Sequence, residues 1–207
     1  MCPPKSGRGP DPAAGPAKRA LRDQLLTLRT RIPAVELGEA AAAITHHLLA
    51  LPEVRRAATV AAYLSIGSEP GTELLLGALR DAGKRVLLPV VLPDLDLDWA
   101  EHDGVLAPAR RGLLEPTGPR LGVDAIGTAD AVLVPGLAVS ADGVRMGRGG
   151  GCYDRALARV PEGTFTCVLL HDGEVRDDVP VEPHDRRVLA AVTPRGVTRL
   201  PAPPARG

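Results

Sequence analysis

The most informative stretch of this sequence is residues 131–159, AVLVPGLAVSADGVRMGRGGGCYDRALAR. It opens with an apolar run, Ala131 to Val134, which is typical of a buried strand, and Pro135-Gly136 ends that run. A loop then leads to three adjacent glycines, after which Cys152 begins a predicted helix. Glycine N–H groups can approach an anion closely, and a helix start adds unpaired donors. This order of strand, glycine loop and helix therefore predicts a phosphate-binding turn.

Two arginines add fixed positive charge to this loop. Arg145 and Arg148 stand on either side of its first glycine, Gly147, and each guanidinium offers a forked set of donors. The loop is not a Walker P-loop, because no Gly-Lys-Ser or Gly-Lys-Thr follows. It is not a dinucleotide fingerprint either, because Cys152 stands where the third glycine should be. Judged on the glycines alone, a merely flexible loop remains the alternative.

The composition indicates a single domain that does not recognise its partners through bulk charge. The 207 residues suit one full core, and 25 basic residues balance 25 acidic ones, so we expect neither nucleic-acid nor membrane binding. There is no 18-residue apolar run and no signal-peptide core at the N-terminus. Cys2, Cys152 and Cys167 have neither disulfide nor metal-ligand spacing, which favours a cytoplasmic location. We expect a monomer that acts on small molecules.

The N-terminal part predicts a tail followed by a helix with two cations on one side. Residues 1–16 are rich in Pro and Gly and are expected to be disordered. Residues 17–31 are expected to be helical, with an apolar stripe of Leu21, Leu25, Leu28 and Ile32. Lys18 and Arg22 lie four residues apart beside this stripe and should repel each other. Either they form a solvated basic face, or an anion between them offsets the repulsion.

The remaining pattern predicts an α/β domain with a mostly parallel sheet. A second helix is expected over 34–51, and a β-α-β unit follows, with parallel strands and a right-handed crossover. The predicted elements are strands at 57–64 and 85–91 around a helix at 72–82, a half-buried strand at 94–99, loops at 111–116 and 179–185, and further strands at 164–170 and 188–192. Ligands collect at the carboxyl ends of strands in such sheets. The loop Tyr63–Gly71, with Glu69 as its one carboxylate, should lie at that edge, although a solvated Glu69 is the alternative.

Several motifs together resemble the 5-formyltetrahydrofolate cyclo-ligase family, also called methenyltetrahydrofolate synthetase. The resemblance covers roughly residues 17–193, and it depends on KRALR (18–22), SEPGT (68–72), GLLEP (112–116), VPGLAVSADGVRMGRGGGCYDR (134–155) and VPVEPHD (179–185). It implies a three-layer α/β/α, Rossmann-like fold with a mostly parallel sheet, of the kind shared with phosphosugar isomerases and CoA-transferases. The expected organisation is a disordered tail at 1–16, one domain over 17–194 and a frayed tail at 195–207.

The resemblance implies an ATP- and Mg²⁺-dependent ligase. Such an enzyme closes 5-formyltetrahydrofolate to 5,10-methenyltetrahydrofolate and releases ADP and phosphate. ATP phosphorylates the formyl oxygen, N10 of the folate attacks the activated carbon, and phosphate leaves. The protein's share would be to align the formyl oxygen with the γ-phosphate and to neutralise charge.

The resemblance also implies a role for each matching residue. The ATP and phosphate contacts would come from Lys18, Arg19, Arg22, Arg145, Gly147, Arg148, Gly149, Gly150, Gly151 and Tyr153. Arg148 would stabilise the transferring phosphoryl group. Glu69 would bind the folate through pterin N–H donors, and Tyr63 would line the same cleft. Asp154 and Asp185 would hold magnesium, because carboxylate oxygens suit this cation. The alternatives are complementation of a helix dipole for Asp154 and a loop-stabilising hydrogen bond for Asp185.

Two positions depart from the family's pattern. The family often has Gly-Tyr-Tyr-Asp where this chain has Gly-Cys-Tyr-Asp, so Cys152 replaces an aromatic beside the ligand. A glutamine that is common before the last motif is Glu174 here, which would alter a contact. Three hypotheses remain: a cyclo-ligase, a phosphosugar isomerase or CoA-transferase-like enzyme of related architecture, and an inactive folate- or nucleotide-binding homologue. The last is supported only by the changes at Cys152 and Glu174.

Overall fold

A seven-stranded sheet forms the centre of the molecule. The computed structural model describes residues 14–109, 112–182 and 185–202. Within the sheet the strand order is β11-β10-β9-β6-β1-β2-β3. Five strands run parallel: β1 (Thr59–Ala61), β2 (Arg85–Val91), β6 (Ala131–Pro135), β9 (Phe165–Leu169) and β10 (Ala190–Thr193). The edge strands β3 (Leu97–Glu101) and β11 (Gly196–Arg199) are antiparallel to their neighbours. The inner strands consist largely of buried Val, Leu and Ala, as strands covered on both faces require.

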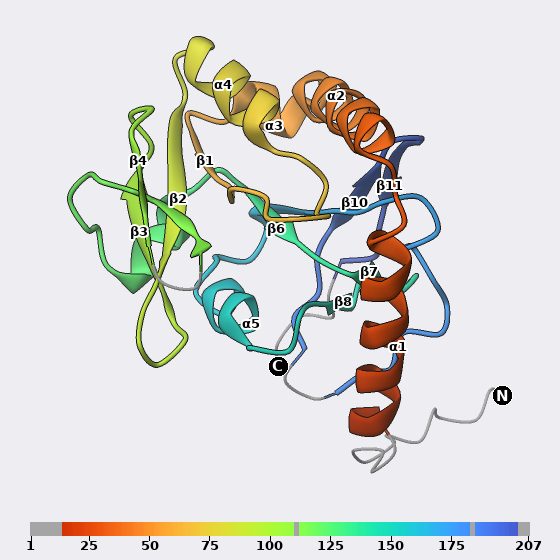
Figure 1. Ribbon diagram of the computed structural model, residues 1–207. Helices are drawn as coiled ribbons and strands as arrows, with labels where there is room; N and C mark the ends of the chain where they lie inside the picture. Colours follow the sequence, from red (N-terminus) through yellow and green to blue (C-terminus); the bar gives the residue numbers. More distant parts are fainter. Residues whose placement is uncertain (1–13, 110–111, 183–184, 203–207) are drawn as a thin grey trace, which may run out of the picture.

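Helices cover both faces of this sheet, which gives three layers (Figure 1). One face carries α2 (Ala34–Ala50), α3 (Pro52–Arg56) and α4 (Glu73–Asp81), whose buried apolar residues share a core cluster with β1, β2, β6, β9 and β10. The other face carries the short α5 (Cys152–Leu157) and the 3-10 helix η2 (Val123–Thr128), which pack on the opposite side of the same strands. The predicted three-layer α/β/α fold with a mostly parallel sheet is therefore confirmed.

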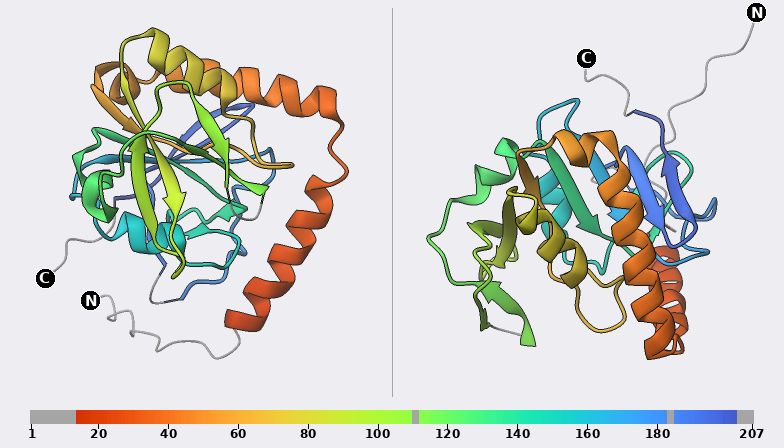
Figure 2. Two further views of the ribbon diagram at one scale, coloured as in Figure 1. Left: turned by 60° about the vertical axis from the view of Figure 1, so that its left-hand side comes forward. Right: turned by 90° about the horizontal axis from the view of Figure 1, so that it is seen from above.

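Helix α1 (Ala14–Arg29) stands beside these layers rather than within them (Figure 2). Leu21 and Leu25 pack against a third apolar cluster that includes Leu137 and Met146 of the hairpin β7 (Ala138–Val139) and β8 (Arg145–Met146). A further small hairpin pairs β4 (Leu106–Pro108) with β5 (Leu114–Pro116). None of the helices in the described part of the chain is long and apolar enough for a membrane crossing.

The structure corrects three of the expected boundaries. Helix α1 begins at Ala14, inside the tail expected at 1–16, and residues 1–13 lie outside the described residues. The tail expected from residue 195 is wrong over β11, because Gly196–Arg199 pairs with β10 and Val197 packs against the core. The segment predicted as a loop at 111–116 ends in β5, whose partner strand β4 was not predicted. The division into one domain and two tails otherwise stays a prediction.

Candidate active site

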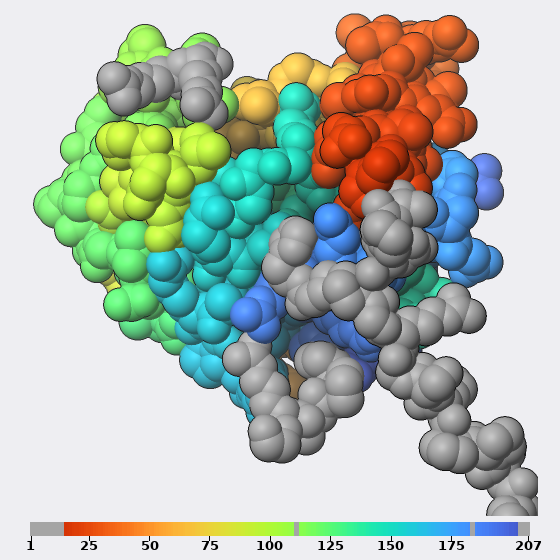
Figure 3. All heavy atoms as spheres, turned by 90° about the horizontal axis from the view of Figure 1, so that it is seen from below, coloured from red at the N-terminus to blue at the C-terminus, as the bar shows by residue number. Residues whose placement is uncertain are grey.

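A cavity of about 690 Å³ lies at the carboxyl ends of the central strands. Its walls come from α1, the loop after β1, the end of β2, the start of β3, the glycine loop, α5 and the segment around residue 185. Figure 3 views this side of the molecule and shows the glycine loop (teal) between the β2–β3 turn (yellow-green) and α1 (red). Segments far apart in the sequence thus meet where a doubly wound sheet places its ligands.

The glycines give the loop a shape that other residues would disturb. A Cβ on Gly147 would lie 2.6 Å from Nη1 of Arg145, so the guanidinium can sit here only because a side chain is absent. Gly149 and Gly151 have φ values of +98° and +68°, a region that strongly favours glycine, and Gly151 is the N-cap of α5. The loop is therefore a formed turn with specific neighbours rather than a spacer.

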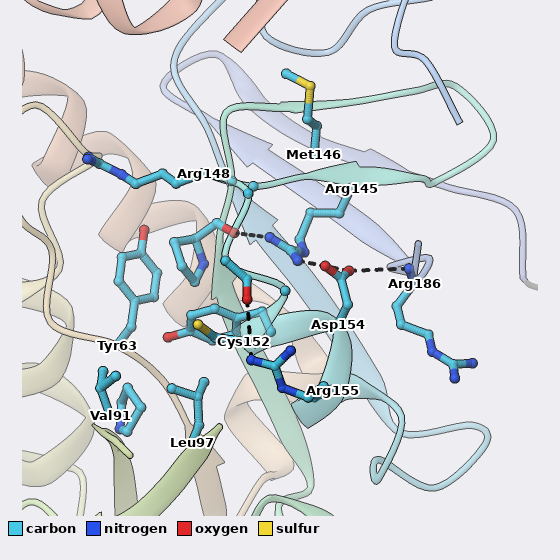
Figure 4. Close-up of a pocket in the computed structure, with 18 of the residues that line it drawn as sticks. Tyr63, Val91, Leu97, Arg145, Met146, Arg148, Cys152, Asp154, Arg155 and Arg186 are labelled. Atoms are coloured by element: carbon cyan, nitrogen blue, oxygen red, sulfur yellow. Dashed lines mark hydrogen bonds and ion pairs between the residues drawn. The ribbon is translucent and has the colours of Figure 1, made fainter. Parts of the chain in front are cut away.

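Arg145 is a buried cation that organises the floor of the cavity. Its Nη2 donates to Asp154 Oδ1 at 3.0 Å, its Nη1 donates to the carbonyl of Pro135 at 3.1 Å, and it lies 5.7 Å from the ring centre of Tyr153 (Figure 4). Asp154 also accepts a hydrogen bond from the backbone N–H of Arg186 at 3.4 Å. The carboxylate expected to hold magnesium is thus already engaged by a cation of the neighbouring strand.

Helix α1 brings two of its three expected phosphate ligands to the cavity. Lys18 Nζ lies 2.5 Å from Asp185 Oδ2 and 2.9 Å from Glu182, and Arg22 Nε donates to the carbonyl of Gly147 at 3.0 Å. Acceptor groups of the chain itself therefore offset the repulsion between Lys18 and Arg22. A bound anion, which was one of the two alternatives drawn from the sequence, is not needed for this. Arg19 is exposed and is not among the residues that line the cavity, so the prediction that it binds ATP finds no support in the geometry.

Glu69 and Arg148, which were assigned to different ligands, contact each other. Arg148 Nε donates to Glu69 Oε1 at 3.1 Å, and Glu69 Oε2 accepts from the backbone N–H of Ile66 at 3.0 Å. The glutamate is 8% exposed, so the alternative of a solvated Glu69 is not what the structure shows, whereas the arginine side chain is 46% exposed. Figure 4 shows Arg148 extending past Tyr63 at one side of the cavity. Both residues line the cavity, and they are paired with each other in this structure.

Tyr63 is the polar group in the cavity wall that most clearly suggests a contact with a ligand. It is 3% exposed, and its hydroxyl has no hydrogen-bond partner within the part of the chain that the structure describes. Burial raises the pKa of Tyr63, and it also raises the pKa of Tyr153. Both phenols therefore remain neutral at physiological pH and keep their O–H donors.

The wall opposite the glycine loop is aliphatic. It consists of Leu64, Ile66, Leu88, Val91, Leu97, Leu113 and Leu114. The sequence did not identify these residues, because leucine and valine in strands look like core until the tertiary structure exposes one side. Arg155, Glu182 and Arg186 also line the cavity without having been predicted, whereas Cys152 was expected beside the ligand. The available signals for this wall were the alternation Leu95, Leu97, Trp99, the loop Tyr63–Gly71 at the ligand edge and the GLLEP motif.

Glu174, where a glutamine was expected, does not line the cavity. Its Oε1 accepts from Arg29 Nε at 2.7 Å, its Oε2 accepts from Arg29 Nη2 at 2.6 Å, and both side chains are almost fully buried. Arg29 Nη2 also donates to the carbonyl of Gly136 at 2.7 Å. The extra negative charge of Glu174 is thus matched inside the protein, and an altered ligand contact at this position is not supported.

The described residues provide carboxylates for a magnesium ion but no complete cage. Asp154 and Asp185 both line the cavity, and no group of three or more His, Cys, Asp or Glu residues in the described ranges is placed to hold a metal ion. Mg²⁺ commonly takes one or two carboxylates and completes its shell with substrate phosphates and water. These two aspartates therefore fit a cation that arrives together with a nucleotide.

A family model, related sequences and a solved structure all relate this chain to the same family. Residues 14–194 match the family model described as the 5-formyltetrahydrofolate cyclo-ligase family. A 5-formyltetrahydrofolate cyclo-ligase of Mycolicibacterium smegmatis is 42% identical over 192 residues, covering 89% of this chain and 97% of that protein. One from Escherichia coli is 34% identical over 168 residues, covering 78% and 90%. The NMR structure of Aquifex aeolicus 5,10-methenyltetrahydrofolate synthetase has a TM-score of 0.76 at 26% identity and covers 92% of this chain and 96% of that one.

Proposed function

This chain belongs to the 5-formyltetrahydrofolate cyclo-ligase family, and we propose that it catalyses the ATP-dependent cyclisation of 5-formyltetrahydrofolate to 5,10-methenyltetrahydrofolate. The observation that carries the proposal is the composition of the cavity. One end gathers cations around a glycine turn, and the other end is an aliphatic wall with buried polar groups. A triphosphate suits the first end, and a pteridine with its attached ring suits the second.

The nucleotide end would hold the phosphates through donors that the chain already presents. Arg22, Arg145 and Arg148 surround the turn, and the glycines leave the backbone N–H groups accessible. Lys18 would exchange part of its pairing with Asp185 for a phosphate oxygen. Because the chain already holds Arg22 and Arg145 in place, only Lys18 and Arg148 have to change partners when the ligand binds.

The folate end would fix the substrate through Glu69 and Tyr63. The Glu69 carboxylate can accept from pterin N–H donors, and the neutral Tyr63 hydroxyl can donate to a ring nitrogen or carbonyl. The pair between Glu69 and Arg148 supports an exchange of partners on binding. Arg148 would turn to the phosphoryl group and Glu69 to the pterin, so that each charge remains paired throughout.

The reaction then proceeds in two steps, phosphorylation of the formyl oxygen and closure of the ring. The formyl oxygen attacks the γ-phosphorus, the bond to the bridging oxygen breaks, and ADP leaves. N10 next attacks the activated formyl carbon, the carbon–oxygen bond breaks, and inorganic phosphate departs, while N10 loses its proton to form the methenyl bridge. Arg148 would stabilise the charge on the transferring phosphoryl group. Magnesium, held by Asp154 and Asp185 with the phosphates, would supply charge neutralisation there.

Neither alternative is favoured. The curated relatives and solved structures described above carry cyclo-ligase or synthetase names, not those of phosphosugar isomerases or CoA-transferases. The case for an inactive homologue depended on Cys152 and Glu174, and the charge of Glu174 is matched by Arg29. Cys152 is half-buried and lines the cavity, where a smaller side chain widens the space beside the ligand.

Absorbance in the methenyl-folate band tests this function directly. Purified protein is mixed with 5-formyltetrahydrofolate and Mg²⁺, and the band is followed before and after ATP is added. We expect the band to grow only after ATP addition, with one ADP released per methenyl group. ATP binding without any increase in the band would instead support the inactive homologue.

A further inference from the structure

The side chain of Arg155 joins two segments that form opposite parts of the cavity. Its Nη2 donates to the carbonyl of Leu95 at 2.5 Å, in the turn between β2 and β3. The same nitrogen also donates to the carbonyl of Gly150, in the glycine loop, at 3.3 Å. Figure 4 draws a dashed line from the labelled Arg155. Arg155 itself lines the cavity from α5. One guanidinium thus contacts both the turn behind the aliphatic wall and the turn expected to hold phosphate.

The Leu95 turn needs support from its neighbours. Leu95 has a φ of 68°, and it is the one residue other than glycine with positive φ in the described ranges. Such a conformation persists in a bulky residue only where the surroundings fix it. Besides Arg155, the support comes from Asp96, whose carboxylate receives two hydrogen bonds from Arg159, at 2.9 and 2.5 Å. Arg155 of α5 and Arg159, two residues beyond the end of α5, therefore hold the turn at two points.

This turn joins two residues of the aliphatic wall. Val91 is the last residue of β2 and Leu97 is the first of β3, and both line the cavity on either side of the turn. At the other contact, the Gly150 carbonyl shares one planar peptide with the N–H of Gly151. Fixing the carbonyl therefore fixes the direction of a donor in the glycine loop.

We propose that Arg155 is a positioning residue that couples folate binding to nucleotide binding. The proposal rests on the proposed function of the cavity. A folate packed against Val91 and Leu97 fixes the β2–β3 turn, the turn fixes Arg155, and Arg155 orders the Gly150–Gly151 peptide for the phosphates. By thermodynamic reciprocity, the nucleotide tightens folate binding by the same factor. The enzyme thereby favours the ternary complex over either binary one.

Arg159, in the turn that follows α5, is a matched control. It docks the same β2–β3 turn through Asp96 and also pairs with Asp124, and neither partner belongs to the glycine loop. Arg159→Met therefore loosens the β2–β3 turn without removing the link to Gly150. Arg155→Met removes that link, and Arg155→Lys keeps a cationic donor but replaces the guanidinium nitrogen that contacts both carbonyls with a flexible ammonium.

The test measures the dissociation constant of 5-formyltetrahydrofolate with and without a non-hydrolysable ATP analogue, and that of the analogue with and without the folate. In the unmodified protein we expect the second ligand to tighten binding by about 5-fold or more. For each ligand, the ratio of the dissociation constants without and with the second ligand measures the coupling. Arg155→Met should bring both ratios to near one, Arg155→Lys should recover part of the coupling, and Arg159→Met should keep most of it. Thermal unfolding of each variant verifies that the fold is intact.

Two outcomes would overturn the inference while leaving the proposed function standing. One is binding of both ligands to the unmodified protein with no mutual effect. The other is an unchanged ratio in Arg155→Met. Failure of the unmodified protein to bind either ligand would instead contradict the proposed function, and the coupling would fall with it.

Discussion

At the glycine-loop end of the cavity the charged groups are paired within the chain, whereas the opposite end offers aliphatic side chains fixed by the sheet. Lys18 is held by Asp185, Arg145 by Asp154 and Arg148 by Glu69. The aliphatic wall has no such partners to lose. A ligand at the first end must exchange one ion pair for another, while a ligand at the second end gains the full effect of removing apolar surface from water.

This difference separates the roles of the two ends. Exchange between ion pairs yields little net binding energy, but it can favour the charge distribution of a transition state over that of the ground state. Burial on the aliphatic wall gives affinity without such selectivity. We therefore expect changes at the polar end to alter mainly turnover, and changes at the aliphatic end to alter mainly the KM for folate.

Replacing Arg148 should have the largest effect. We expect Arg148→Ala to lower kcat by about 1,000-fold or more, because an arginine on a transferring phosphoryl group is worth that much in other enzymes. The side chain is 46% exposed, so the fold should survive. Arg176→Ala is a suitable control, since Arg176 pairs with Asp178 and does not line the cavity. Undiminished turnover in Arg148→Ala would remove this residue from the mechanism.

Breaking the buried pair beneath the polar end should mainly cost stability. Arg29→Met leaves the Glu174 carboxylate buried without its cation, and we expect a loss of about 3–5 kcal/mol in the free energy of unfolding, measured with urea. The double variant Arg29→Met/Glu174→Leu should recover most of that loss, because it removes both charges together. Equal destabilisation in the single and double variants would show that the pair's charge is not the cause.

Adding one methyl group to the glycine loop should affect nucleotide binding more moderately. Gly147→Ala places a Cβ 2.6 Å from Arg145 Nη1, so the guanidinium must move relative to Asp154. We expect the KM for ATP to rise about 10-fold, which corresponds to about 1.4 kcal/mol, with little change in the KM for folate. Gly38→Ala is the matched control. Gly38 lies within α2, and no atom lies within 4 Å of the Cβ that the substitution would add. A similar rise in the KM for ATP in Gly38→Ala would show that the effect does not depend on the contact between Gly147 and Arg145.

The smallest effect is expected at the aliphatic end. Leu114 lines the cavity and is 46% exposed, so Leu114→Ala removes apolar surface that the folate would bury and leaves the core intact. We expect the KM for folate to rise about 3- to 10-fold, equivalent to about 1 kcal/mol, at unchanged kcat. Leu74→Ala, at an exposed leucine of α4 outside the cavity, should change neither. A fall in kcat with no change in KM would contradict the division of roles.

The sequence predicted the elements whose signals are local. The apolar run at Ala131, the glycine turn and the β-α-β unit appear in the structure at nearly the expected positions. Strand β11 was missed because Gly196–Arg199 is short and lies between prolines, so its strand character comes only from pairing with β10. Propensity over four residues is too weak a signal to compete with flanking breakers.

The pairing of the charged residues in the cavity was not predicted. Arg145 and Asp154 belong to one motif and contact each other, although they were assigned to different ligands. The helix stripe at 17–31 was expected to bury Leu28, yet Leu28 is 46% exposed and its neighbour Arg29 is buried. A buried arginine is stable only with its counter-charge, and Glu174 lies 145 residues away, beyond any local pattern.

A crystal structure with a non-hydrolysable ATP analogue and 5-formyltetrahydrofolate tests the central claim most directly. We expect the γ-phosphate within hydrogen-bonding distance of backbone N–H groups of residues 147–151, with the Arg148 guanidinium turned from Glu69 towards it. The formyl oxygen should face the γ-phosphorus from the side of the aliphatic wall. A triphosphate bound elsewhere, with the glycine turn facing solvent and Arg148 still paired with Glu69, would contradict the account.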